Sequence, residues 1–414
     1  MKANKKAVLA YSGGLDTSII LKWLSEALHY QVIAVCVDVG QKEDFKALEK
    51  KALNTGAASV MVIDAKDSFI EDYVFKGLKA GAVYEDDYLL GTAYARPLIA
   101  KILVNIAKAE NASAIAHGAT GKGNDQVRFE ASIKALYPEV DIIAPWRIWD
   151  LNSRDALLNY AHKHNIPVPV SKENNYSRDD NLWHISHEGH DLESPQNAHD
   201  PAIYWKCQPI GAYSNAEKVS IDFEQGIPVA IDGVKMPAVE IVSTLNDLAG
   251  KCGVGVVDIV ENRLVGMKSR GVYETPGGTV LYHAHKVLEK LTLDKATMHY
   301  KQKIALEYAD LLYNGLWYSP LKTALDAFVD ETQKYVSGTV NLQLQSGTTR
   351  TLSATSPYSL YDEELVTFNE DNVYDQGDAT GFINLFSLSL KYYGKKHNLF
   401  EDNKMISTTH TKVV

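Results

Sequence analysis

The chain lacks the features that identify secreted, membrane-spanning or disulfide-stabilised proteins. Its 414 residues include only three cysteines, Cys36, Cys207 and Cys252, which lie far apart and form no Cys-x-x-Cys pair. This usage argues against structural zinc and a disulfide framework, and it favours a reducing compartment. No apolar run reaches the ~18 residues that a membrane helix needs, and no apolar segment of a signal peptide precedes the first strand pattern. We therefore expect a cytoplasmic protein with no membrane partner.

A stretch rich in lysine or arginine is also lacking, and the net charge is −10. A protein that binds nucleic acid normally carries a basic patch or stripe. The tryptophans and tyrosines are scattered, without the basic and aromatic clustering of an RNA-binding platform. We expect no nucleic-acid partner, although a fold can gather basic residues locally and the charge alone does not exclude one.

The composition is that of a globular protein, with 45% hydrophobic and 23% charged residues. The length predicts about two or three domains of ~150 residues, which is ample for a large core.

Residues 7–18, Ala-Val-Leu-Ala-Tyr-Ser-Gly-Gly-Leu-Asp-Thr-Ser, contain the most informative motif. The apolar run at residues 7–11 predicts a buried strand that stops at Ser12-Gly-Gly14. A helix with an apolar face begins at Asp16-Thr-Ser18. Two glycines let the backbone turn tightly and bring its N–H groups close to a ligand, while the hydroxyls and the helix N-terminus favour an anion. The motif therefore predicts a phosphate cradle.

The order of residues in this loop indicates which kind of phosphate ligand it binds. A Walker-A loop would carry a lysine after the glycines, and this loop has none; the Gly-x-Gly-x-x-Gly spacing of a dinucleotide fold is missing as well. The order Ser-Gly-Gly-x-Asp-Thr-Ser resembles the pyrophosphate loop of ATP pyrophosphatases, which split ATP between its α- and β-phosphates. The alternative is an ordinary strand-to-helix turn capped by Asp16. Seven ordered positions in a strand–loop–helix context favour ATP chemistry over that alternative.

Strand and helix patterns alternate up to about residue 165. Residues 31–39 are almost continuously apolar, as a strand covered on both faces would be. A helix is predicted at 43–54 with Gly56 as its C-cap. Further strands are predicted at 59–63, 112–116 and 141–145, and further helices at 95–109 and 126–136. The alternation predicts an α/β fold with a doubly wound parallel sheet, in which ligands gather at the carboxyl ends of the strands.

The loop at residues 117–130 follows one of these strands and offers different groups. Three glycines allow the backbone to come close to a ligand, and Thr120, Asn124 and Asp125 offer a hydroxyl, an amide and a carboxylate. Arg128 is able to hold a carboxylate in a bidentate grip. This set suits a zwitterionic amino acid better than a second phosphate. The alternative, equally weighted on this segment alone, is a capped helix start with Asp125 as N-cap and Arg128 paired to Glu130 or solvent.

Blocks of sequence along the chain resemble the argininosuccinate synthase family. They are Ala10-Tyr-Ser-Gly-Gly-Leu-Asp-Thr-Ser18, Gly40-Gln-Lys-Glu-Asp44, Tyr88-Leu-Leu-Gly-Thr92 with Ala95-Arg-Pro97, the loop 117–130, Asp180-Asn-Leu-Trp-His-Ile-Ser186, Glu261-Asn-Arg263, Gly266-Met-Lys-Ser-Arg-Gly-Val-Tyr-Glu-Thr-Pro276 and Tyr282-His-Ala-His285. The blocks stand in order and span roughly residues 7–285, so the resemblance is far more specific than one motif. The C-terminal third contributes much less.

The resemblance implies an AMP-forming ligase of arginine biosynthesis. Such an enzyme joins the partners citrulline and aspartate, with ATP as co-substrate and Mg²⁺ as cofactor, and releases argininosuccinate, AMP and pyrophosphate. The citrulline ureido oxygen attacks the α-phosphate to form a citrullyl-adenylate, and the aspartate amine then displaces AMP. The implied fold is an adenine nucleotide α-hydrolase-like sheet followed by an α+β synthetase domain and a C-terminal oligomerisation helix.

The resemblance also assigns site residues position by position. The ATP site comprises Ala10, Tyr11, Ser12, Gly13, Gly14, Leu15, Asp16, Thr17, Ser18, Val37 and Gly118. Within it, Ser12 and Asp16 are the catalytic candidates, with Ser12 in the pyrophosphate cradle and Asp16 either near Mg²⁺ or ordering the loop. The aspartate site comprises Thr120, Asn124 and Asp125, and the citrulline site comprises Tyr88, Asn124, Arg128, Ser177, Ser186, Glu261 and Tyr273. Asp125 is expected to receive the substrate ammonium and Arg128 to hold the citrulline carboxylate.

One position departs from the family pattern. Ala93 stands where many members have serine. One hydrogen bond to citrulline is therefore in doubt unless a neighbouring group or a water replaces it.

The histidines receive a structural interpretation. His187-Glu-Gly-His190 is one residue short of the zinc motif His-Glu-x-x-His, and Gly189 disfavours a helix, so we do not expect zinc there. His283 and His285 are expected to serve packing or hydrogen bonding.

Three domains are expected, at residues 1–166 for ATP binding, 167–365 for the synthetase and multimerisation functions, and 366–414 for a C-terminal helical arm. The second begins at the Pro167-Val-Pro169 break and mixes β-like runs at 227–231 and 256–260 with long helices from about 280 to 335. A hairpin is predicted at 335–344 and 349–352. A helix within 372–393 carries an apolar stripe through Phe382, Leu385, Leu388 and Tyr392, and the resemblance implies a homotetramer with an interlocking arm.

Three functions therefore remain after the sequence analysis. The ligase accounts for both loops and for the blocks in the second half. A tRNA-modifying enzyme shares only the first loop, and a non-catalytic adenine-nucleotide sensor would bind ATP without splitting it. The amino-acid loop at 117–130 argues against both rivals.

Overall fold

The computed structural model describes residues 5–151, 153–167, 176–367 and 373–397. The chain divides into two compact units, Met1–Leu360 and Tyr361–Val414. Most of the expected break at Pro167-Val-Pro169 lies outside the described residues.

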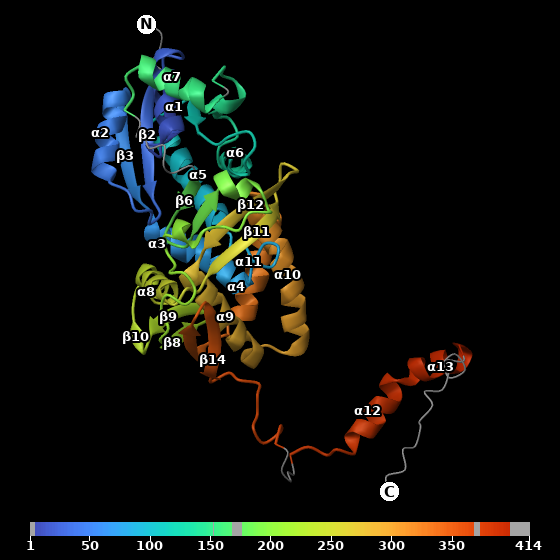
Figure 1. Ribbon diagram of the computed structural model, residues 1–414. Coiled ribbons are helices and arrows are strands. Elements are labelled where there is room, and N and C mark those ends of the chain that lie inside the picture. Colours follow the sequence, from blue (N-terminus) through green and yellow to red (C-terminus); the bar gives the residue numbers. More distant parts are fainter. Residues whose placement is uncertain (1–4, 152, 168–175, 368–372, 398–414) are drawn as a thin grey trace. The chain divides into compact units, whose positions relative to one another are not determined.

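The larger unit begins with a five-stranded parallel sheet in the order β3-β2-β1-β4-β5 (Figure 1). Its strands are β1 (Lys6–Ala10), β2 (Gln31–Asp38), β3 (Ser59–Asp64), β4 (Ala114–Ala116) and β5 (Asp141–Ile143). The chain proceeds outward from β1 to β3 and then returns to place β4 on the other side of β1. The strand order therefore reverses beside β1, which is where ligands bind in open α/β sheets.

Both faces of this sheet are covered, because successive residues of β1 enter different cores. Ala7 and Leu9 belong to one buried cluster and Val8 to the other. The first cluster contains side chains of α1 (Leu15–Glu26), α2 (Phe45–Thr55) and α7 (Arg154–Lys163). The second contains side chains of α5 (Gly91–Ala109) and α6 (Asp125–Leu136). The predicted doubly wound sheet is confirmed, and Gly56 is the left-handed C-cap of α2 as expected.

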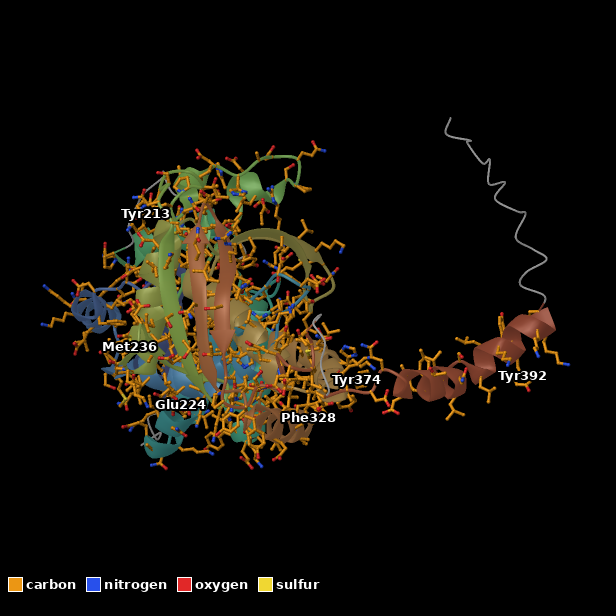
Figure 2. All side chains as sticks on the ribbon, turned by 90° about the horizontal axis from the view of Figure 1, so that it is seen from below. Tyr213, Glu224, Met236, Phe328, Tyr374 and Tyr392 are labelled. Carbon is orange, nitrogen blue, oxygen red and sulfur yellow. The ribbon has the colours of Figure 1, made fainter. Side chains whose placement is uncertain are left out.

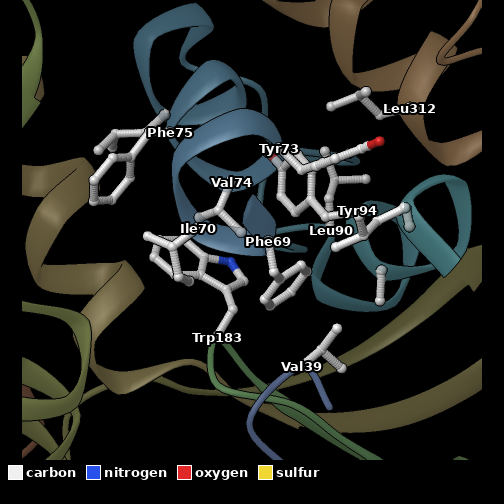
Figure 3. Close-up of a cluster of buried hydrophobic side chains, with 14 of the residues drawn as sticks. Val39, Phe69, Ile70, Tyr73, Val74, Phe75, Leu90, Tyr94, Trp183 and Leu312 are labelled. Atoms are coloured by element: carbon white, nitrogen blue, oxygen red, sulfur yellow. The ribbon is translucent and has the colours of Figure 1, made fainter. Parts of the chain in front are cut away.

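The connection from β3 to α5 joins the first half of the unit to the second. It consists of α3 (Lys66–Ser68), the π-helical η1 (Phe69–Val74) and α4 (Phe75–Ala80). Figure 3 shows Phe69 and Ile70 of η1 packed beside Trp183, a residue of the second half. The indole N–H of Trp183 donates to the Leu89 carbonyl oxygen at 2.9 Å. One continuous core therefore holds the two halves together.

The second half of the unit contains two antiparallel sheets, with orders β11-β12-β7-β6 and β10-β9-β8-β13-β14. Their strands are β6 (Ser177–Asp180), β7 (Ile185–Glu188), β8 (Glu217–Glu224), β9 (Ile227–Ile231), β10 (Val234–Lys235), β11 (Val256–Asn262), β12 (Lys268–Glu274), β13 (Gly338–Gln345) and β14 (Thr348–Thr355). The helices are α8 (Ala238–Lys251), α9 (Pro276–Thr292), α10 (Lys295–Tyr313) and α11 (Pro320–Gln333), and the short 3₁₀ segments are η2 (Pro145–Arg147), η3 (His190–Glu193) and η4 (Pro201–Ile203).

The five-stranded sheet buries one face through alternation. Val219, Ile221 and Phe223 of β8 are buried and their neighbours are not, and β13 shows the same pattern. Figure 2 shows the strands of this sheet edge to edge, with Glu224 at the end of β8. The predicted hairpin is confirmed as β13 and β14.

The smaller unit contains α12 (Asp378–Phe386) and α13 (Leu388–His397). The predicted helix is therefore present as two helices with Ser387 between them, and Ser387 Oγ donates back to the Ile383 carbonyl oxygen at 2.6 Å. All four residues of the predicted apolar stripe are exposed, namely Phe382, Leu385, Leu388 and Tyr392, and Figure 2 shows Tyr392 among them.

Among the described residues, no helix combines the length and the apolar character that crossing a bilayer requires.

Candidate active site

The loop between β1 and α1 is a tight turn that only glycine permits. Gly13 has a φ of +73°, a conformation that costs glycine little. A Cβ on Gly13 would lie 1.9 Å from Leu48 Cδ2 of α2. Gly14, rather than Asp16, is the N-cap of α1, and it makes no side-chain cap. The first N–H groups of α1 have no partner within the helix and favour an anion in front of them.

Hydroxyl groups organise this loop from inside. Ser12 Oγ lies 3.2 Å from Thr17 Oγ1, and Tyr11 Oη lies 3.3 Å from Ser18 Oγ. Ser12 is exposed, whereas Thr17 and Ser18 are buried. Burial raises the pKa of Tyr11, so its side chain remains a neutral hydroxyl. The loop therefore presents Ser12 to solvent on a framework of buried hydroxyls.

The other predicted ATP residues lie around the same end of the sheet. Ala10 is the last residue of β1, and Leu15 and the half-buried Asp16 begin α1. Val37 lies near the end of the adjacent β2. A Cβ on Gly118, after β4, would lie 3.1 Å from Thr17 Cγ2, so the second loop packs directly against the first.

The loop after β4 is held in place by the second half of the unit. Asn124 Nδ2 donates to Tyr313 Oη at 2.8 Å, and Asn124 Oδ1 accepts from the Leu264 N–H at 2.9 Å. Arg128 Nε donates to the Tyr313 carbonyl oxygen at 2.9 Å. Thr120 is exposed at the start of this loop. The conformation of the loop therefore depends on residues far along the chain.

Arg128, which is buried, and Asp125, which is half-buried, form part of an ion cluster. Arg128 Nη1 lies 3.0 Å from Asp125 Oδ1, and Arg96 Nε donates to Asp125 Oδ2 at 2.9 Å. Arg96 also pairs with Asp179 of β6. The alternative, with Arg128 paired to Glu130 or solvent, is wrong, because Arg128 is buried and pairs with Asp125. Glu130 pairs with Arg147 at 2.6 Å instead. The N-cap of α6 is Asn124 rather than Asp125.

The two carboxylates of this cluster have opposite pKa shifts. Burial acts to raise the pKa of Asp125, but the charges of Arg96 and Arg128 outweigh burial and lower it. Burial raises the pKa of Asp179, and the nearby Asp125 adds to the rise while Arg96 opposes it. Arg96 is shared between Asp125 and Asp179, but only Asp125 also contacts Arg128. Asp125 therefore stays ionised to a lower pH than Asp179.

Four predicted citrulline residues share one face of the four-stranded sheet. Tyr273 of β12 lies opposite Ser186 of β7, and Ser186 lies opposite Asp179 of β6. Side chains opposite one another in an antiparallel pair point to the same face, as do residues two apart. By this rule Ser177, Ser186, Glu261 and Tyr273 all lie on the face that carries Asp179. Ser177 is the exposed member of the set.

Aromatic rings enclose the buried part of this face. The ring centroids of Tyr88 and Tyr273 lie 4.7 Å apart, and the Arg128 guanidinium lies 4.8 Å from the Tyr313 ring centroid. Tyr273 Oη donates to Glu261 Oε1 at 3.1 Å. Glu261 Oε2 is buried and has no hydrogen-bond partner among the described residues. Burial raises the pKa of Glu261, and the nearby Tyr313 hydroxyl and Arg128 oppose the rise. An oxygen of this kind is suited to accept a donor from a ligand.

Ala93 lies in the hydrophobic core beside this face and is fully buried. The neighbouring Thr92 Oγ1 lies 3.0 Å from His184 Nε2, and the Thr92 N–H donates to Tyr88 Oη at 3.2 Å. The pKa of His184 is far below its usual value because of burial and nearby cations. The hydroxyl next to Ala93 is thus already used to position the neutral His184.

The four histidines that the sequence analysis considered, His187, His190, His283 and His285, have structural partners. His187 Nε2 lies 2.6 Å from Glu274 Oε1. The expectation for His283 and His285 is confirmed by their hydrogen bonds to Thr351 Oγ1 at 2.8 Å and to Gln333 Oε1 at 2.7 Å.

Several site residues were missed by the sequence analysis. Arg96 and Tyr313 contact the predicted residues Asp125 and Asn124 directly, and Asp179 pairs with Arg96. The sequence offered a reason to include Arg96 among the site residues, because it lies in the matching block Ala95-Arg-Pro97. It offered none for Asp179 and Tyr313, since only the tertiary fold brings them to the site.

Comparison with known proteins agrees with this arrangement over nearly the whole chain. A family model described as Arginosuccinate synthase N-terminal HUP domain matches residues 6–167, and one described as Arginosuccinate synthase C-terminal domain matches residues 176–393. The chain belongs to the argininosuccinate synthase family. The family match extends past residue 285, where the resemblance in the sequence blocks ended.

Curated relatives named argininosuccinate synthase align over most of their lengths. The protein of Alkaliphilus metalliredigens (strain QYMF) is 61% identical over 390 residues, which is 94% of each chain. That of Caldanaerobacter subterraneus subsp. tengcongensis is 60% identical over 392 residues, or 94% of this chain and 96% of the relative. That of Moorella thermoacetica is 60% identical over 388 residues, or 94% and 95%.

Proposed function

We propose that the chain joins L-citrulline to L-aspartate and consumes ATP, as an argininosuccinate synthase of arginine biosynthesis. The observation that carries the proposal is the meeting of the two loops. Gly118 of the amino-acid loop packs on Thr17 of the pyrophosphate loop, so an amino acid held by the former reaches a nucleotide held by the latter. A tRNA-modifying enzyme or an ATP sensor would not need the polar face around Glu261 and Tyr273.

In this proposal the end of β1 binds ATP. The N–H groups of Gly13, Gly14 and the first turn of α1, with the hydroxyls of Ser12, Thr17 and Ser18, cradle the pyrophosphate. Ala10, Tyr11, Leu15, Val37 and Gly118 complete the nucleotide site. Ser12 is the exposed hydroxyl of the loop, which supports its role next to the reacting phosphates.

Citrulline binds on the face that carries Tyr88, Ser186, Glu261 and Tyr273, with Ser177 at its rim and Arg128 on its carboxylate. Aspartate binds at Thr120, Asn124 and Asp125. Asp125 keeps a low pKa through Arg96 and Arg128, which supports its role as an anionic receiver of an ammonium group. Since Arg128 pairs with Asp125, an incoming carboxylate shares this arginine rather than meeting an unpaired charge.

The chemistry proposed is adenylation followed by displacement. The ureido oxygen of citrulline forms a bond to the α-phosphorus while the bond to pyrophosphate breaks, and the aspartate amine then displaces AMP from the citrullyl-adenylate. No covalent nucleophile on the protein is needed. Positioning and stabilisation of phosphate charge carry the catalysis, and each charge-assisted hydrogen bond contributes about 1.5–3 kcal/mol.

Mg²⁺ is also part of the proposal. Asp16 is a half-buried carboxylate in the first turn of α1, and Mg²⁺ is typically held by one or two carboxylates together with substrate phosphates. The Asp16 carboxylate is therefore a suitable ligand for Mg²⁺, and the ion would neutralise phosphate charge when bound.

Setting and assembly complete the proposal. We infer a cytoplasmic enzyme, supported by three cysteines that are all buried thiols, and a homotetramer, supported by the exposed apolar side chains of α12 and α13. The same proposal includes three domains, at residues 1–166, 167–365 and 366–414. It includes no nucleic-acid partner.

The test is pyrophosphate release from Mg-ATP with citrulline and aspartate together and with each omitted. Release should require citrulline, and added aspartate should couple it to AMP and argininosuccinate. Asp16→Asn should lower the rate by about 10- to 100-fold, the loss of one charge-assisted interaction. Asp67→Asn makes the same change in the first turn of α3, where Asp67 is exposed, and should leave the rate unchanged. A folded protein that binds ATP but releases no pyrophosphate would contradict the ligase and favour the sensor or the RNA enzyme.

A further inference from the structure

Lys51 of α2 contacts the pyrophosphate loop from outside it. Its Nζ donates to the Gly13 carbonyl oxygen at 2.5 Å across 38 positions of sequence. The side chain is half-buried, and burial lowers the pKa of its ammonium group while Glu43 opposes that change. Leu48, one turn earlier on α2, fills the space beside the same glycine. Two side chains of α2 therefore hold Gly13.

The contact fixes the direction of one peptide group. In a trans peptide the C=O and the following N–H lie in one plane and point in opposite directions. The Gly13 carbonyl oxygen accepts from Lys51 Nζ at 2.5 Å and, at the longer distance of 3.4 Å, from Ser18 Oγ. The stronger of these two bonds directs the carbonyl toward α2, so the Gly14 N–H points away from α2. Gly14 is exposed at the N-terminus of α1, so this N–H faces the side where an anion would bind. A pair of glycines does not hold a peptide orientation by itself, because it lacks side-chain restraint.

We propose that Lys51 is the positioning lysine of the pyrophosphate loop. It orients the Gly13–Gly14 peptide toward the departing pyrophosphate and supplies, from the next helix, the positive charge that a Walker-A loop carries within its own sequence. This inference rests on the proposed function, because the anion in question is the β,γ-pyrophosphate of ATP. Lys51 thus places a positive charge beside a pyrophosphate loop that contains no lysine of its own.

Pyrophosphate binding to the full-length protein tests the role without any turnover. Calorimetry with pyrophosphate alone should show Lys51→Met binding about tenfold more weakly than wild type, equal to about 1.4 kcal/mol. The matched control is Lys50→Met, because Lys50 is an exposed neighbour on the same helix, and it should bind within about twofold of wild type. Lys51→Arg keeps the charge and should restore most of the affinity, whereas Lys51→Gln keeps a donor only and should fall between Arg and Met.

Steady-state kinetics gives the second readout. Lys51→Met should raise KM for ATP or lower kcat/KM for ATP by a similar factor, while KM for citrulline stays near the wild-type value. Equal losses in the Arg, Gln and Met variants, or equal losses at positions 50 and 51, would overturn the proposal. A wild-type protein that binds pyrophosphate but makes no argininosuccinate would overturn the ligase instead, and the calorimetric series would still decide the role of Lys51.

Discussion

Several residues of the site occupy environments that cost the apo protein stability. Glu261 is buried with one oxygen bonded to Tyr273 and the other without a partner among the described residues. Asp179 is an acid whose pKa burial raises, and it shares Arg96 with Asp125. Groups of this kind are retained where a ligand needs them, even though apolar residues would pack more favourably.

Glu261→Gln should separate stability from function. A carboxyl whose pKa is raised on folding binds protons more readily when folded, so it makes unfolding easier as pH rises from the ordinary pKa of Glu through the raised value. The amide does not titrate, so the variant should lose less stability over that window and be more stable than wild type at neutral pH. Denaturant unfolding at several pH values measures this.

The same variant should bind citrulline about 10- to 100-fold more weakly, because a charged acceptor is lost. Glu193→Gln, in the short 3₁₀ segment η3, serves as the control and should change neither property. A Glu261→Gln variant with wild-type citrulline affinity would remove Glu261 from the substrate site.

At the scale of elements, strand β12 is shaped to let a tyrosine lie along it. Gly271 is two residues before Tyr273 on the same face, and a Cβ there would lie 2.8 Å from Tyr273 Oη. The missing side chain leaves room for the ring to fold back over the strand, and the hydroxyl then reaches Glu261 of β11. A glycine that would weaken an ordinary strand thus serves the site.

Gly271→Ala should therefore displace the Tyr273 ring. We expect the free energy of unfolding to fall by about 1–3 kcal/mol, as for other overpacked sites, and kcat/KM for citrulline to fall by up to ~100-fold through misplacement. Gly381→Ala adds the same methyl group in α12, where no atom lies within 4 Å. It should leave kcat/KM for citrulline unchanged and should not lower the free energy of unfolding, because alanine favours a helix more than glycine does. Wild-type kinetics in Gly271→Ala would show that the ring position does not matter for the reaction.

Local sequence predicts the pyrophosphate loop, because this part of the site is formed by a single short segment of the chain. The pyrophosphate loop is a strand, a turn and a helix start within residues 7–18, so its residues and shape follow from one segment. Strands β6 and β7 were not predicted, because the site-facing positions of β6 carry Ser177 and Asp179 and those of β7 carry Ser186 and Glu188. Polar side chains there hide the alternation that marks a strand. The pairing of Arg96 with Asp179 spans 83 positions, and no local pattern encodes it.

At the scale of the whole molecule, the C-terminal unit carries apolar side chains that its own two helices leave exposed. Leu385 is 76% exposed and Phe386 is 72% exposed. Short helices of this kind gain most of their stability from packing an apolar face against a partner, which supports contact with further copies of the chain.

Replacing Leu385 and Phe386 with serine in the full-length chain should lower the mass in light scattering from that of the proposed homotetramer. Each buried Leu or Phe contributes about 1.5–3 kcal/mol, so two changes per subunit weaken association strongly. Lys391→Ser alters an exposed residue of α13 and should leave the mass unchanged. An unchanged mass in the double variant would assign these side chains to another role.

The hydrogen bonds that Asn124 and Arg128 donate to Tyr313 have a consequence for the timing of synthesis. A ribosome adds about 5–20 residues per second, so roughly ten to thirty seconds separate the completion of the first sheet from the arrival of Tyr313. During that interval the nascent chain has its nucleotide loop but not the tyrosine that secures the amino-acid loop. The order of the chain thus leaves the loop at residues 117–130 without these two hydrogen bonds until most of the larger unit has been made.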